Sequence, residues 1–197
     1  MFLMSIDTVS LNFCTNLAKK NYGGFGYLTL LTLMFSCSSI VLLQYLLATN
    51  QISFWLHLPL SAYLFYMIYT PLHEAVHGNI SGKQRSLKFV NPLVGVISAM
   101  FLMFSYTEHK WDHLLHHKYT NEPNLDTDYF VKSDNPFGVI IRCALVLFKN
   151  IPYAYRNWDH PDTNTKRNMI QGRLENLIPI AILVLITNMT TLPWYFF

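Results

Sequence analysis

Six of the eight histidines in this chain lie in two clusters whose spacing suits metal binding. The first cluster has the sequence His-Glu-Ala-Val-His over residues 73–77. His73 and His77 are four positions apart, so on a helix they share one face and can bind the same metal ion. Gly78 follows directly, and a glycine at this place is typical of a helix end.

The second cluster is denser and holds the other four histidines of this group. They are His109, His113, His116 and His117. A helix turns by about 100° per residue, so the four side chains fit within an arc of roughly 100°. Four neutral imidazoles stacked near low dielectric would compete for hydrogen-bond partners at a cost in free energy, which favours a metal-binding role. The remaining two histidines are interpreted differently, His57 as a polar group at the membrane interface and His160 as a loop residue.

Six imidazoles without thiolates indicate a site for iron, zinc, copper or nickel, and the ligand type alone does not choose among these metals. The three cysteines are scattered, and none has metal-ligand spacing. Six ligands exceed what one tetrahedral zinc ion requires, so two metal ions are the simpler explanation. An iron pair facing a bilayer would suit oxygen chemistry on an apolar substrate, because breaking an unactivated C–H bond requires a strong oxidant.

Long uncharged stretches predict that membrane helices carry these clusters. The chain is 52% hydrophobic and 13% charged, too apolar for an ordinary soluble domain, and a spanning helix needs about 20 apolar residues. Spans are predicted over residues 25–49, 52–72 and 176–195. The stretch 89–107 carries Asn91, Pro92 and Gly95 near its start. We predict that it is re-entrant or lies in the membrane plane, because a full span would place the two clusters ~30 Å apart on opposite faces.

The basic residues predict the orientation of the helices. Two lysines precede the first apolar stretch, and the other twelve basic residues lie between Lys83 and Arg173. By the positive-inside rule the N-terminus and residues 78–175 face the cytoplasm. The expected fold is all-α, a multi-pass integral membrane bundle of the bacterial inner membrane or endoplasmic reticulum with a cytoplasmic, histidine-lined cap. In the cytoplasmic region we expect an amphipathic surface helix over 136–155 and a polar loop over 157–173.

Three segments together resemble the membrane fatty acid desaturase superfamily, which includes carotenoid hydroxylases and ketolases. They are His-Glu-Ala-Val-His (73–77), His-Leu-Leu-His-His (113–117) and Thr-Asn-Glu-Pro-Asn-Leu-Asp-Thr-Asp (120–128). The H-x3-H box, the H-x2-H-H box about thirty-five residues later and the trailing Thr-Asn-x-Pro signature match that family in order and spacing. The resemblance covers roughly residues 25 to 195.

The resemblance implies an enzyme that holds two iron ions (a di-iron site) and uses O2 to oxidise a lipid. The implied iron ligands are His73, His77, His113, His116 and His117. His109 is an additional candidate because of its place on the stripe, and Asp126 and Asp128 are expected to orient ligand histidines. Electrons would come from a partner such as a cytochrome b5 or ferredoxin, because no nucleotide or flavin motif is present. We expect a fatty acyl desaturase, the larger group, with a carotenoid hydroxylase or ketolase as the alternative.

The chain departs from the family pattern at a third histidine cluster, which the family carries after a further pair of membrane spans. No such cluster precedes Phe197. We therefore expect residues 1–197 to form a single desaturase-like domain that is the N-terminal, incomplete part of a longer enzyme, or a truncated gene product. A non-catalytic fragment, or two chains that pool their ligands, are alternatives.

A different class of enzyme also fits the first cluster. Residues 73–77 satisfy H-E-x-x-H, in which two histidines bind zinc and the glutamate acts as general base. A zinc membrane metalloprotease is therefore an alternative, although it leaves the second cluster unexplained. The net charge of +3 gives no support to nucleic-acid binding.

Overall fold

The computed structural model describes residues 13, 16–17, 23–123, 125–145 and 163–189 of the chain. These residues form helices and no β-strand, which confirms the all-α prediction for the described part of the chain. The helices are α2 (Tyr27–Ala48), α3 (Phe54–His77), α4 (Val90–Phe101), α5 (Tyr106–Tyr119), α6 (Pro136–Ala144) and α8 (Thr163–Met189), with short 3-10 helices η1 (Arg85–Leu87) and η2 (Tyr129–Val131).

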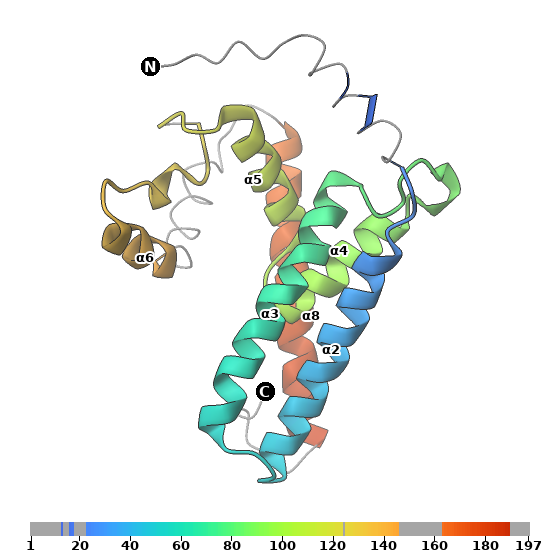
Figure 1. Cartoon of the computed structure of the whole chain (residues 1–197), viewed down its shortest axis with the longest axis vertical. Coiled ribbons are helices and arrows are strands. Elements are labelled where there is room, and N and C mark those ends of the chain that lie inside the picture. Colours follow the sequence, from blue (N-terminus) through green and yellow to red (C-terminus); the bar gives the residue numbers. More distant parts are fainter. Residues whose placement is uncertain (1–12, 14–15, 18–22, 124, 146–162, 190–197) are drawn as a thin grey trace.

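Helices α2 and α3 form an antiparallel hairpin along the long axis of the molecule (Figure 1). The link between them is short because Asn50 adopts a left-handed φ of 57°. Ser53 then caps α3, its hydroxyl accepting a hydrogen bond from the backbone N–H of Leu56 at 3.3 Å. Helix α4 packs against this hairpin, and α8 contacts both α4 and α5.

The packed core lies between α2, α3 and α4. Its buried apolar members include Leu33, Ile40, Leu64, Ile68, Leu72, Val94 and Ala99. Ser36 of α2 and Ser98 of α4 are fully buried, and such small side chains allow helix backbones to approach closely. The outer faces expose large apolar side chains, among them Leu28, Leu31 and Phe35 of α2. This distribution suits a surface in contact with lipid.

The length and composition of the helices bear on the predicted membrane segments. One described helix, α2, is long and apolar enough to cross a membrane by itself. Residues 85–101 and α5 are bent by 105° at the break between them, and they would make a second span if this pair is one broken span. For 52–72, which lies mostly in α3, membrane crossing stays a prediction. It stays a prediction also for 176–195, whose last residues lie outside the described part.

Two expectations for the cytoplasmic region have different outcomes. The polar loop predicted over 157–173 is wrong from Thr163 onward, where α8 begins. The helix begins before the apolar stretch, and Gln171 and Glu175 in its first half bond to the beginning of α5. In the segment 136–155, where a surface helix is expected, α6 extends from Pro136 to Ala144. Asn135 caps this helix, its side-chain oxygen accepting a hydrogen bond from the backbone N–H of Gly138 at 2.7 Å. Residues 146–155 lie outside the described residues.

Candidate metal centre

The last turn of α3 carries the first pair of histidines. Leu72 and Ala75 in this turn are fully buried in the core, so the opposite face of the helix presents His73 and His77 towards α5. Gly78 ends the helix in the left-handed conformation, with φ 73°, and its N–H bonds to the carbonyl of Ala75 at 3.1 Å. The expected helix end at Gly78 is therefore confirmed.

The start of α5 is fixed against α3 and α4 by one aromatic side chain. The buried ring of Tyr106 passes between the helices, and its hydroxyl donates to the carbonyl oxygen of Ala75 at 3.2 Å. A Cβ on Gly95 of α4 would lie 2.2 Å from that ring, so glycine provides the space that Tyr106 occupies. Ser105 caps α5 by accepting the backbone N–H of Glu108 at 3.1 Å.

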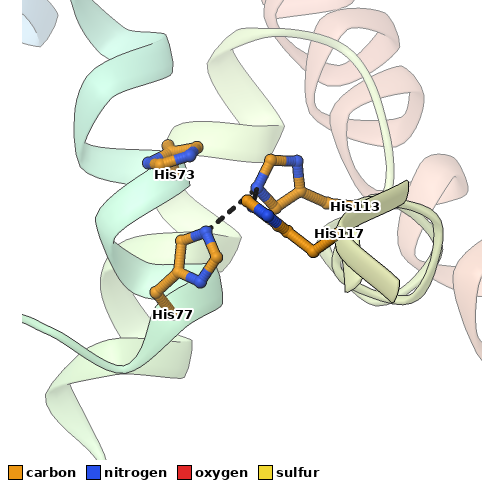
Figure 2. Close-up of side chains that lie close together, drawn as sticks. All are labelled: His73, His77, His113 and His117. Atoms are coloured by element: carbon orange, nitrogen blue, oxygen red, sulfur yellow. Dashed lines mark hydrogen bonds between the residues drawn. The ribbon is translucent and has the colours of Figure 1, made fainter. Parts of the chain in front are cut away.

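Helices α3 and α5 bring four histidines together, and their rings face one another across the gap between the helices (Figure 2). They are His73, His77, His113 and His117. One ring nitrogen of each lies within 4.8 Å of those of the other three. The Nε2 atoms of His77 and His117 each lie 3.0 Å from Nε2 of His113. Nitrogens that bind one tetrahedral ion lie roughly 3.3 Å apart, so this four-histidine group fits a metal ion.

His116 lies on the same helix but points to the loop after α5. Its Nδ1 is 2.7 Å from Oδ1 of Asp126 and 3.7 Å from Oδ2 of Asp128. The first distance is that of a hydrogen bond and the second is too long for one. With Nδ1 bonded to a carboxylate, Nε2 is the atom that His116 can offer to a metal ion. Asp126 thus makes the histidine contact expected of it, and Asp128 lies farther away.

Asp126 is also the centre of the loop that follows α5. Its carboxylate accepts the backbone N–H of Asn121 at 2.7 Å and that of Asp128 at 2.8 Å. Burial would raise the pKa of Asp126, but the hydrogen bonds from His116 and from these two N–H groups outweigh burial and lower it. The carboxylate is therefore charged at neutral pH and holds both the loop and the His116 ring.

His109 lies on the predicted stripe but outside the four-histidine group. Its ring stacks on that of His113, with centroids 5.7 Å apart and planes 26° apart, and it meets the ring of Tyr69 edge-on at 5.7 Å. Its Nε2 atom is buried and has no hydrogen-bond partner among the described residues. A buried nitrogen of this kind beside His113 fits a ligand role, so His109 stays a candidate.

Three histidines of the site, His77, His109 and His113, favour their neutral form. The pKa of His113 is lowered to about 4, by burial first and then by positive charge on the neighbouring histidines. The pKa of His109 is also lowered to about 4, because burial and His73 outweigh the opposing charge of Asp128. The pKa of His77 is also lowered, by burial first and then by His73 and His117. At neutral pH these rings carry a free lone pair, which is the form that binds a metal ion.

Glu74, the acid of the H-E-x-x-H sequence, lies beside the four-histidine group but not in it. Its Oε2 accepts a hydrogen bond from Asn79 at 2.9 Å, and its Oε1 is 3.6 Å from Nδ1 of His73. The two histidines of α5 nevertheless complete a four-imidazole set that zinc also accepts.

The two histidines outside the clusters were predicted to have no part in this site. His57 is buried within α3, and a ring nitrogen of it lies 3.1 Å from the hydroxyl of Ser61. His160 lies outside the described residues.

The contacts that hold the start of α5 were not predicted from the sequence. Ser105 and Glu108 form an S-x-x-E pattern, which is a signature of helix starts and could have located this one. Glu175 of α8 accepts a hydrogen bond from Ser105, 70 positions earlier in the chain. No local sequence pattern predicts a contact between residues so far apart in the chain.

Comparison with protein families identifies the family of the chain. Residues 52–197 match the fatty acid desaturase family, and this region includes α3, α5 and all six candidate ligands. No curated protein and no solved structure matches the chain.

Proposed function

We propose, since this chain belongs to the fatty acid desaturase family, that it oxidises a lipid with O2 at a di-iron site and acts as a fatty acyl desaturase. The observation that carries the proposal is the convergence of the four-histidine group at the end of α3. The family implies a lipid substrate and a membrane context. We favour an acyl chain over a carotenoid as the substrate because the matching family is that of the fatty acid desaturases.

The candidate ligands divide between two positions. The four-histidine group would hold one iron ion. His116 would bind a second ion through Nε2, because its Nδ1 is held by Asp126. His109 would offer its buried Nε2 to the di-iron site as a further ligand. Bound iron would supply, with O2, the oxidant that an unactivated C–H bond requires. The protein supplies neutral imidazoles at fixed spacing and a carboxylate that sets the tautomer of His116.

The substrate and the electron donor would approach from different sides. The lipid chain would lie along the apolar outer face of the hairpin, where α3 exposes Tyr66 and Tyr69 one to two turns before His73. The electron donor, a cytochrome b5 or a ferredoxin, would dock on the cytoplasmic face that the positive-inside rule predicts. Basic residues there complement an acidic donor.

The metal content of the purified chain tests this proposal. Elemental mass spectrometry on detergent-purified protein should find bound iron, and His113→Ala should abolish binding because His113 contacts both His77 and His117. His57→Ala is the matched control and should retain the metal, since His57 lies about 24 Å along α3 from His73. No bound metal would contradict the proposed centre, and one zinc ion per chain would favour the metalloprotease.

Lipid analysis provides the second measurement on the same variants. Cells that express the protein together with an electron donor should accumulate acyl chains that have lost two hydrogens, in proportion to the O2 supplied. His113→Ala should remove this product while His57→Ala keeps it. Iron-loaded protein that leaves both acyl lipids and carotenoids unchanged would refute lipid oxidation.

A further inference from the structure

Glu175 of α8 binds the first turn of α5 through several hydrogen bonds. One carboxylate oxygen accepts the hydroxyl of Ser105 at 2.8 Å and the backbone N–H of Thr107 at 2.9 Å. The other oxygen accepts the hydroxyl of Thr107 and the side-chain amide of Gln171. Burial would raise the pKa of Glu175, but these hydrogen bonds outweigh it and lower the pKa, so the carboxylate is charged at neutral pH.

The two helices approach closely at this junction. A Cβ on Gly172, one turn before Glu175, would lie 2.3 Å from Cγ of Glu108 and 2.8 Å from the Ser105 hydroxyl. Gln171 also donates to the hydroxyl of Thr107 at 3.1 Å. Glycine at 172 therefore brings α8 near enough for Glu175 to reach the free N–H groups at the start of α5, where a negative charge is favourable.

The position of α5 matters because the helix carries half of the four-histidine group. His113 lies eight residues beyond Ser105, which is about 12 Å along a helix. A tilt of only about 5° at the first turn would shift His113 by about 1 Å, several times the ~0.2 Å within which metal–ligand distances must fall. Tyr106 is the only described residue of α5 that is buried, so apolar packing alone restrains the helix weakly.

We infer that Glu175 is a positioning residue of the metal centre. From α8 it fixes the first turn of α5 and thereby the distance from His113 and His117 to the two histidines of α3. The inference rests on the proposed metal centre, and it assigns α8 a direct part in that centre although the described residues of α8 contribute no histidine.

Cobalt binding tests the inference without the need for activity. The visible absorption of Co²⁺ bound to imidazoles reports the affinity of the detergent-purified full chain for the ion. Glu175→Ala should weaken Co²⁺ binding about tenfold or more, the range for partners that orient metal ligands, and Glu175→Gln should have a smaller effect. Hydrogen–deuterium exchange in the first turn of α5 should increase in the same order, with or without metal.

The matched control lies on the same part of α8. Arg173 is half-exposed, and Nε of its guanidinium lies 3.5 Å from the carboxylate of Glu108. Arg173→Gln removes that ion pair but none of the hydrogen bonds of Glu175, so it should leave Co²⁺ affinity and α5 exchange unchanged. If Glu175→Ala and Arg173→Gln behave alike in both measurements, Glu175 does not position the centre.

A double-mutant cycle covers the case in which Glu175→Ala fails to fold. Thr107→Val removes the hydroxyl that donates to Glu175, and Glu175→Gln retains the shape of the side chain. If both act through the same contact, the double variant should lose less Co²⁺ affinity than the sum of the single losses. Additive losses would overturn the inference. A wild-type chain that binds no Co²⁺ would refute the metal centre instead, and the exchange measurement would still decide the role of Glu175.

Discussion

The two helices that carry the histidines are held in place by different forces. The end of α3 is anchored by apolar packing, since Leu72, Ala75 and Val76 are almost completely buried between its histidines and the core. Helix α5 has Tyr106 as its one described buried residue. Apart from Tyr106, it is held by polar contacts at each end, with Glu175 at its start and Asp126 beyond its end.

The difference predicts how each half of the site responds to mutation. Apolar packing spreads over many atoms, so its loss lowers the free energy of unfolding but leaves the histidines of the folded protein in place. A polar contact is concentrated in a few atoms of fixed direction, so its loss changes the geometry directly. We therefore expect α3 to govern stability and α5 to govern metal affinity.

The largest expected effect is on the packing of α3. Leu72→Ala should lower the free energy of unfolding by about 2–5 kcal/mol, because Leu72 is fully buried and its removal leaves a cavity. Thermal unfolding in detergent measures this change. Leu60→Ala, at an exposed position on the same helix, is the control and should cost far less. Co²⁺ affinity of the folded Leu72→Ala protein should stay near that of the wild type. A large loss would show that packing on α3 also sets the metal geometry.

A smaller effect is expected at the end of α5. Asp126→Ala leaves His116 and the N–H groups of Asn121 and Asp128 without their acceptor. The expected cost is about 1–3 kcal/mol of unfolding free energy, together with faster hydrogen–deuterium exchange at residues 121–128. Asp128→Ala is the control, since the Asp128 side chain is 58% exposed and lies 3.7 Å from His116. Equal effects of the two substitutions would contradict the central place of Asp126 in this loop.

The contrast between the helices also explains what could be predicted from the sequence. The H-x3-H spacing and Gly78 locate the first pair of histidines and the end of their helix, because both features depend on residues within one or two turns. The apolar runs likewise predict the all-α fold. The grouping of His73 with His113 followed from family resemblance and not from spacing, since 40 positions separate the two residues.

The prediction that was wrong, and the part of the site that spacing did not resolve, have a common physical cause. The loop predicted over 157–173 was assigned from polar composition, but the segment from Thr163 is helical, and its polar residue Gln171 bonds to Thr107 of α5. The ligand role of the four histidines of α5 stays a prediction, and the stripe alone did not distinguish their surroundings. In the structure His116 turns to Asp126 and His109 stacks behind His113. Helical periodicity gives the direction of a side chain to about a quarter turn, and partners distant in sequence decide the rest.

The smallest expected effect compares two glycines that have equal space around them. A Cβ would meet nothing within 4 Å at either Gly78 or Gly24, but only Gly78 has a positive φ, 73°. Gly78→Ala should therefore cost about 1 kcal/mol of unfolding free energy through backbone strain alone, while Gly24→Ala should cost nothing or stabilise slightly. Thermal unfolding measures the difference.

The metal affinity of the same variant sharpens the comparison of the two helices. Because the core holds α3 on the N-terminal side of Gly78, the Co²⁺ affinity of Gly78→Ala should hardly change. If Gly78→Ala weakened Co²⁺ binding as much as Glu175→Ala, the end of α3 would depend on local contacts as α5 does, and the distinction between the two helices would fail.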